Sequence, residues 1–98
     1  METEETQVLV LVARPGAADW DRLYGQLRES RADGPRVVEC DVSAFDPADG
    51  GALVVVGGLA RLQLTARRGG REIRLRGAGR ELLELLELTG LGEQLPPR

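Results

Sequence analysis

The sequence predicts a small α/β domain, with a mostly parallel sheet and helices packed mainly on one face of it. Three short apolar segments have the composition of strands: 7–13, 36–42 and 72–76. Three longer segments repeat their apolar residues at helical spacing: 17–32, 51–68 and 80–89. The order is therefore β-α-β-α-β-α, and strands joined by helices of this length form parallel sheets with right-handed crossovers.

The first strand and helix are read from apolar patterning. Segment 7–13 (QVLVLVA) has no charge, which is typical of a strand covered on both faces, so we expect it at the centre of the sheet. In 17–32 the apolar residues share one helical face: Trp20, Leu23, Tyr24 and Leu27. We expect Trp20 and Tyr24 to pack in the core or at its edge, whereas an exposed Trp would indicate an interface.

The second strand alternates, with Val38, Cys40 and Val42 on one face. In the helix at 51–68 we expect one apolar stripe to face the core: Leu53, Val56, Ala60 and Leu64, widened by Leu59 and Leu62. The glycine pair 57–58 inside it costs about 1 kcal/mol per residue relative to Ala. The pair therefore indicates a close neighbour or an irregular turn.

The last two elements are strongly patterned. Segment 72–76 (EIRLR) alternates strictly, so we expect a strand covered on one face only. Segment 80–89 is amphipathic, and Gly90 is expected to cap it, with Leu91 packing back. The leucine face at 82–88 is mainly core, but it could also serve a homodimer or a partner helix.

Length and composition limit the function. A chain of 98 residues is one domain, which we place at 7–95 between a flexible acidic N-terminus (1–6) and a tail (96–98). His and Lys are absent and there is a single Cys, so one chain cannot hold a Ser-His-Asp triad, a Cys-His pair, a Schiff-base lysine or a Cys/His zinc site. We expect a binding module that is not an enzyme and has no cofactor or metal.

Charge and hydropathy limit the location and partners. The net charge is −3, and the 13 basic residues, all Arg, form no basic stripe, so nucleic acid is not an expected partner. The longest apolar run, 52–56, is far shorter than the roughly 20 residues that span a bilayer, and no leader precedes it. We therefore expect a cytoplasmic protein without membrane insertion.

Three stretches carry a resemblance to a known family: Asp33–Ser43 (DGPRVVECDVS), Asp49–Leu53 (DGGAL) and Glu81–Leu91 (ELLELLELTGL). The chain resembles a STAS domain, the family of anti-sigma-factor antagonists and sulfate-transporter tails, with the N-terminal hairpin shortened to one clear strand. The resemblance implies a non-catalytic interaction module whose partner is an anti-sigma factor, a small ATP-binding serine kinase. The alternative is a STAS subunit of a lipid-transport ABC assembly, whose partner is a transporter subunit.

In the regulatory members of this family, a serine at the position of Gly51 receives phosphate from the kinase. Gly51 has no hydroxyl, and neither Ser nor Thr occurs from 44 to 64, so that switch cannot operate at this loop. A phosphate would add about −1.5 to −2 charges at the start of a helix. The resemblance places the partner-binding loop at seven residues: Asp46, Ala48, Asp49, Gly50, Gly51, Ala52 and Leu53.

The aspartates admit other roles. Asp49 is expected to cap the helix at 51–68, which is compatible with contacting a partner. Asp46 and Asp49 are close enough for a metal or acid–base pair, but two loop carboxylates without His are weak evidence. Asp41 ends its strand, where open α/β sheets bind ligands, although we expect it to accept loop N–H groups. An enzyme using Asp41, Asp46 and Asp49 with Arg is the alternative from another class.

Three further features have simple expected roles. Cys40 is expected to be a small buried residue instead of a reactive thiol. The segment 77–79 (GAG) is expected to be a turn instead of an anion site. The arginines of the third strand region are expected to be solvated on the outer face, with an acidic partner as the alternative: Arg71, Arg74 and Arg76.

Overall fold

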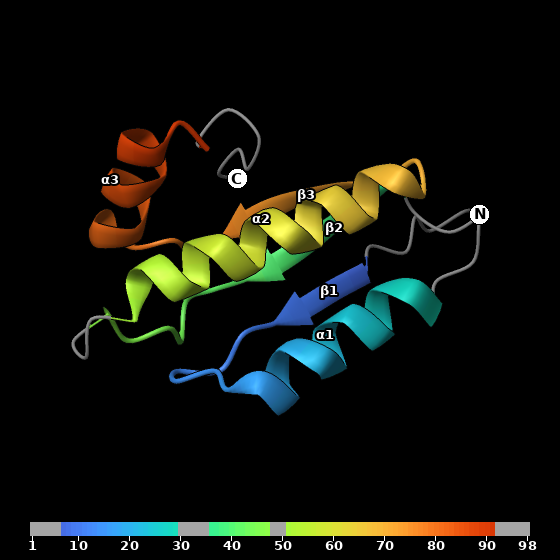
Figure 1. Ribbon diagram of the computed structural model, residues 1–98, viewed down its shortest axis with the longest axis horizontal. Coiled ribbons are helices and arrows are strands. Elements are labelled where there is room, and N and C mark those ends of the chain that lie inside the picture. Colours follow the sequence, from blue (N-terminus) through green and yellow to red (C-terminus); the bar gives the residue numbers. More distant parts are fainter. Residues whose placement is uncertain (1–6, 30–35, 48–50, 92–98) are drawn as a thin grey trace, which may run out of the picture.

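The computed structural model describes residues 7–29, 36–47 and 51–91 (Figure 1). Strands and helices alternate in the order β1 (Gln7–Val10), α1 (Ala17–Glu29), β2 (Val37–Asp41), α2 (Ala52–Arg68), β3 (Glu72–Arg76) and α3 (Arg80–Thr89). The predicted α/β class and element order are confirmed, and the bounds of β3 and α3 agree with the prediction. The expected flexible N-terminus and tail lie outside the described residues.

The three strands form a parallel sheet in the order β1-β2-β3. Each crossover advances by one strand in the same direction, and right-handed crossovers of this kind place successive helices on the same face. Figure 1 shows α1 and α2 side by side over the sheet, with α3 beyond the carboxyl end of β3. The helices therefore form a single layer.

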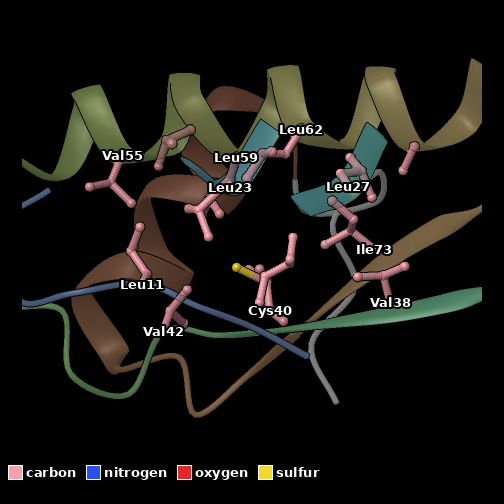
Figure 2. Packing of buried hydrophobic residues seen from close by; sticks show 14 of the residues in the cluster. Leu11, Leu23, Leu27, Val38, Cys40, Val42, Val55, Leu59, Leu62 and Ile73 are labelled. Carbon is pink, nitrogen blue, oxygen red and sulfur yellow. The ribbon is translucent and has the colours of Figure 1, made fainter. Parts of the chain in front are cut away.

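The core lies between the sheet and this layer (Figure 2). In the middle row of the sheet, Leu9 of β1, Cys40 of β2 and Leu75 of β3 lie in register, and all three are fully buried. All three helices contribute buried side chains to the core. These are Leu23 and Leu27 from α1, Val55, Val56, Leu59, Leu62 and Ala66 from α2, and Leu82 and Leu86 from α3. Removing this apolar surface from water is the main term that stabilises the fold.

The predicted central position of segment 7–13 is wrong. β1 is an edge strand, and the side chains of Val8 and Val10 are 42% and 54% exposed. The cause is the crossover direction, which moves the chain away from β1 at each step and leaves β2 in the middle. In the part of the chain that the structure describes, no helix covers the second face of the sheet.

The predicted core stripe of α2 is confirmed at Val56, Leu59 and Leu62, which are buried, but it is wrong at its two ends. Leu53 and Leu64 are 63% and 53% exposed. The buried face consists of neighbouring positions, among them two alanines and a glutamine: Ala52, Val55, Val56, Leu59, Leu62, Gln63 and Ala66. Because α2 carries apolar residues around most of its circumference, hydropathy alone does not fix which face meets the sheet.

Gln63 explains part of this orientation. Its side-chain amide donates from Nε2 to the carbonyl oxygen of Ile73 at 3.1 Å, and its Oε1 accepts from the Ile73 N–H at 2.8 Å. β3 is an edge strand, so these backbone groups have no neighbouring strand to bond. The amide of Gln63 takes the place of a strand's peptide group and satisfies both.

The glycine pair of α2 marks the closest approach of α1. A Cβ on Gly58 would lie 2.5 Å from the ring of Trp20, whereas a Cβ on Gly57 would meet nothing within 4 Å. The expected close neighbour is confirmed at Gly58, and α2 continues through both glycines. At the end of α3, Gly90 adopts φ 77°, and the N–H of Leu91 donates to the carbonyl of Leu86 at 3.0 Å, which confirms the predicted cap.

The two glycines should respond oppositely to the same substitution. Gly57→Ala should stabilise the protein by up to about 1 kcal/mol, because Ala favours the helix and meets no neighbour. Gly58→Ala should destabilise it by about 1–3 kcal/mol, because the indole of Trp20 must move. Urea denaturation measures both, and the fluorescence of Trp20, the single Trp of the chain, should shift only in Gly58→Ala. Equal stabilisation by both variants would contradict the close contact.

Candidate functional site

The start of α2 holds three described members of the predicted partner-binding loop: Gly51, Ala52 and Leu53. Gly51 is partly exposed, has the ordinary backbone angles φ −82° and ψ 5°, and has nothing within 4 Å of an added Cβ. Leu53 projects into solvent, but Ala52 is buried and belongs to the inner face of the helix. Ala48, Asp49 and Gly50 lie outside the described residues, as does the expected Asp49 cap. The open position of Gly51 shows that neither space nor backbone strain requires glycine there.

The loop before α2 is tied to the loop after β1. The N–H of Asp46 donates to the carbonyl of Ala13 at 3.1 Å, and its carboxylate lies 3.9 Å from the guanidinium of Arg14. Both side chains are largely exposed, so this ion pair contributes little to stability. The backbone bond is therefore the firmer link, and it holds Asp46 beside the end of β1.

Asp41 has the local role that we expected. Its Oδ1 accepts hydrogen bonds from the N–H and the hydroxyl of Ser43, at 2.9 and 2.6 Å. These bonds favour the charged form and lower the pKa of Asp41. The turn after β3 packs on Ser43. Gly77 in this turn has φ 74°, and a Cβ there would lie 2.7 Å from Cβ of Ser43. The segment 77–79 is thus a tight turn, as predicted.

The aspartates do not come together as a metal site within residues 7–29, 36–47 and 51–91, where no group of three or more His, Cys, Asp or Glu side chains gathers. The metal or acid–base pair considered for Asp46 and Asp49 involves a residue outside the described part. The expected location of Cys40 is confirmed. It is fully buried in the middle of the core (Figure 2), and burial raises the pKa of its thiol to about 12.

The predicted row of solvated arginines is wrong for Arg71. Arg71 is only 8% exposed, and its guanidinium lies 3.4 Å from Oε1 of Gln7 and 3.5 Å from the carbonyl of Leu27, near the C-terminus of α1. Arg71 precedes β3, so strand alternation does not govern it, and the helix end supplies carbonyl acceptors. Arg74 and Arg76 do lie on the open sheet face, where they pair with Glu72 and Glu39 at 3.5 and 3.6 Å.

A groove between α1 and α2 was not predicted. It has a volume of about 480 Å³ and is lined by residues of both helices: Ala17, Trp20, Asp21, Tyr24, Val54, Gly57, Gly58 and Arg61. At Gly57 the groove is open because no side chain projects there, whereas the ring of Trp20 fills the space beside Gly58. Burial raises the pKa of Tyr24. The guanidinium of Arg61 opposes this rise and the carboxylate of Asp21 adds to it, so the charges of Arg61 and Asp21 both act on the Tyr24 phenol. The sequence signal that could have located this groove was the glycine pair 57–58, which indicated a close neighbour of α2.

The solvent side of α2 borders this groove. We define the outer stripe of α2 as five residues at helical spacing: Leu53, Val54, Gly57, Arg61 and Leu64. Its apolar members are 63%, 66% and 53% exposed at Leu53, Val54 and Leu64. Clustered exposed apolar residues on one helix are typical of interaction surfaces. The outer stripe begins two residues after Gly51 and reaches the groove at Val54, so the described start of α2 and the groove are parts of one surface.

Comparison of the chain with protein-family models, curated proteins and solved structures gave no match. Among the described residues, no helix has the length and apolar character needed to cross a bilayer.

The buried thiol predicts a pH dependence of stability. The pKa of Cys40 rises from 9.0 to about 12 on folding, so the unfolded chain loses this proton first as the pH rises. The stabilising contribution is complete below pH 9 and is lost between pH 9 and 12, by at most about 1.4 kcal/mol per pH unit. Urea denaturation on both sides of pH 9 should show this fall, and Cys40→Val should show a smaller one. Identical slopes in the two proteins would contradict the assignment.

Proposed function

We propose that this chain is a non-catalytic protein–protein interaction module that acts in the cytoplasm and resembles an anti-sigma-factor antagonist. Its partner is an anti-sigma factor of the ATP-binding serine kinase class. The observation that carries the proposal is the pair of exposed side chains Leu53 and Val54, 63% and 66% accessible, in the first turn of α2, which follows the open position of Gly51. A partner that covers exposed apolar residues at the start of a helix removes their surface from water, which makes the free energy of binding more favourable.

The chemistry of this surface favours recognition by shape. Gly51 offers no hydroxyl to a kinase, and the exposed side chains that follow it, Leu53 and Val54, are apolar. The nearest described carboxylate of the loop, on Asp46, has Arg14 beside it. A partner that docks here therefore meets a mainly apolar surface without the added charge of a phosphate, and we propose that the module is held in the form that binds its partner.

A STAS subunit of a lipid-transport ABC assembly is the second candidate. It rests on the same sequence feature, because the hydroxyl-free Asp49–Leu53 (DGGAL) resembles that group of subunits. The partner separates the two candidates. Co-purification with a serine kinase favours the first, and co-purification with an ATP-binding cassette subunit favours the second.

Two variants at one position test the proposal. Gly51→Ser and Gly51→Asp both add a side chain into open space, and both suit a helix start, where an acid is also favoured by the helix dipole. Gly51→Ser should bind the anti-sigma kinase of the same genome with nearly the wild-type affinity. Gly51→Asp should weaken binding by at least about tenfold, since its charge must be desolvated against an apolar contact. Isothermal titration calorimetry measures both.

Three results would count against this proposal. Unchanged affinity of Gly51→Asp would mean that the partner does not contact the start of α2. Absence of binding by the wild-type chain to the kinase would reject the anti-sigma assignment. Equal loss of binding in both variants would indicate that any side chain at position 51 blocks contact, so that charge is not the determinant.

A further inference from the structure

We infer that the two helices that flank the groove, α1 and α2, pack against a second copy of this chain, in a symmetric dimer whose two-fold axis runs along the groove. The inference goes beyond the proposed function, because it concerns a different partner, and the dimer contact shares Val54 with the surface that we propose for the kinase. It rests on the charges of the two groove walls and on the exposed apolar residues of the outer stripe of α2.

The two walls of the groove carry opposite charges. Asp21 lies on the α1 wall and Arg61 on the α2 wall, both are exposed, and both act electrostatically on Tyr24 between them. An occupant that matches both walls presents a cation to Asp21 and an anion to Arg61. A uniformly acidic or uniformly basic partner would be repelled by one of the walls.

A second copy supplies both charges in the required places. Rotation by a half turn about an axis along the groove places α1 of one copy over α2 of the other, because the two helices lie side by side over the sheet (Figure 1). Asp21 then faces Arg61 of the second copy, and Arg61 faces Asp21 of the second copy. Each contact occurs twice, as an isologous interface requires.

The apolar groups match in the same arrangement. Val54 and Leu64 of the outer stripe are 66% and 53% exposed, and the half-buried rings of Trp20 and Tyr24 lie on α1. The rotation brings α1 of one copy, with these rings, over the outer stripe of the other. Gly57 adds no side chain at the centre, which lets the second copy approach closely. Aromatic groups in the middle of a contact with charges around them resemble the anatomy of known interfaces.

Charge exchange tests this geometry. Asp21→Arg places two arginines on each groove, and Arg61→Asp places two aspartates there. The wild-type chain should show concentration-dependent dimerisation in sedimentation velocity, and each variant alone should dimerise at least about tenfold more weakly, because like charges then face each other. An equimolar mixture of the two variants should form a heterodimer, since every pair across the axis is again opposite. Circular dichroism confirms that each variant is folded.

A matched pair of leucine variants provides the control. Leu64→Arg changes the outer stripe of α2, and Leu88→Arg makes the same change on α3, where Leu88 is 81% exposed. Leu64→Arg should weaken the dimer by at least about tenfold, and Leu88→Arg should leave it unchanged. A monomeric wild-type chain, a dimer lost in Leu88→Arg instead, or a charge-exchange mixture that stays monomeric would each overturn the inference. These results leave kinase binding by Gly51→Ser and Gly51→Asp as a separate question.

Discussion

The contact between the backbone of Gly58 and the indole of Trp20 determines how α1 and α2 lie on the sheet. Any side chain at position 58 would collide with the ring, at 2.5 Å for the first added carbon. This approach brings Leu23 and Leu27 of α1 into the same core as Leu59 and Leu62 of α2. It also shapes the groove, because the ring of Trp20 fills the space beside Gly58 while Gly57 projects no side chain between the two helices. One packing constraint thus sets both the core and the main concave surface.

A single helical layer makes the orientation of α2 decisive for function. The inner face of α2 is fixed by burial and by the two hydrogen bonds of Gln63 to Ile73, which substitute for a missing strand. Once that face is fixed, Leu53, Val54 and Leu64 have no place in the core and remain exposed. The apolar surface that we assign to binding is therefore a direct consequence of how β3 completes its backbone hydrogen bonds.

The sequence was most informative where one periodicity was unambiguous. Strict alternation at 72–76 and the leucine–glutamate pattern at 80–89 predicted both elements to the residue, and the glycine pair predicted a close neighbour. Prediction failed where the pattern was compatible with two environments. Apolar residues on both faces of segment 7–13 could not reveal an edge position, and those around α2 could not show that Leu53 and Leu64 lie outside the core. The burial of Arg71 and the groove depend on contacts between distant segments, which no local pattern contains.

We assign binding to the outer face of α1 and α2, which a partner would recognise through its shape, its apolar groups and one pair of opposite charges. The alternative surface is the open face of the sheet, where Val8 and Val10 lie beside the Arg76–Glu39 ion pair. Backbone amide chemical shifts of the isotope-labelled chain distinguish the two most directly, measured on dilution and on addition of the kinase. We expect chemical-shift changes confined to residues 17–24 and 51–64. Changes centred on β1 and β3 would contradict it.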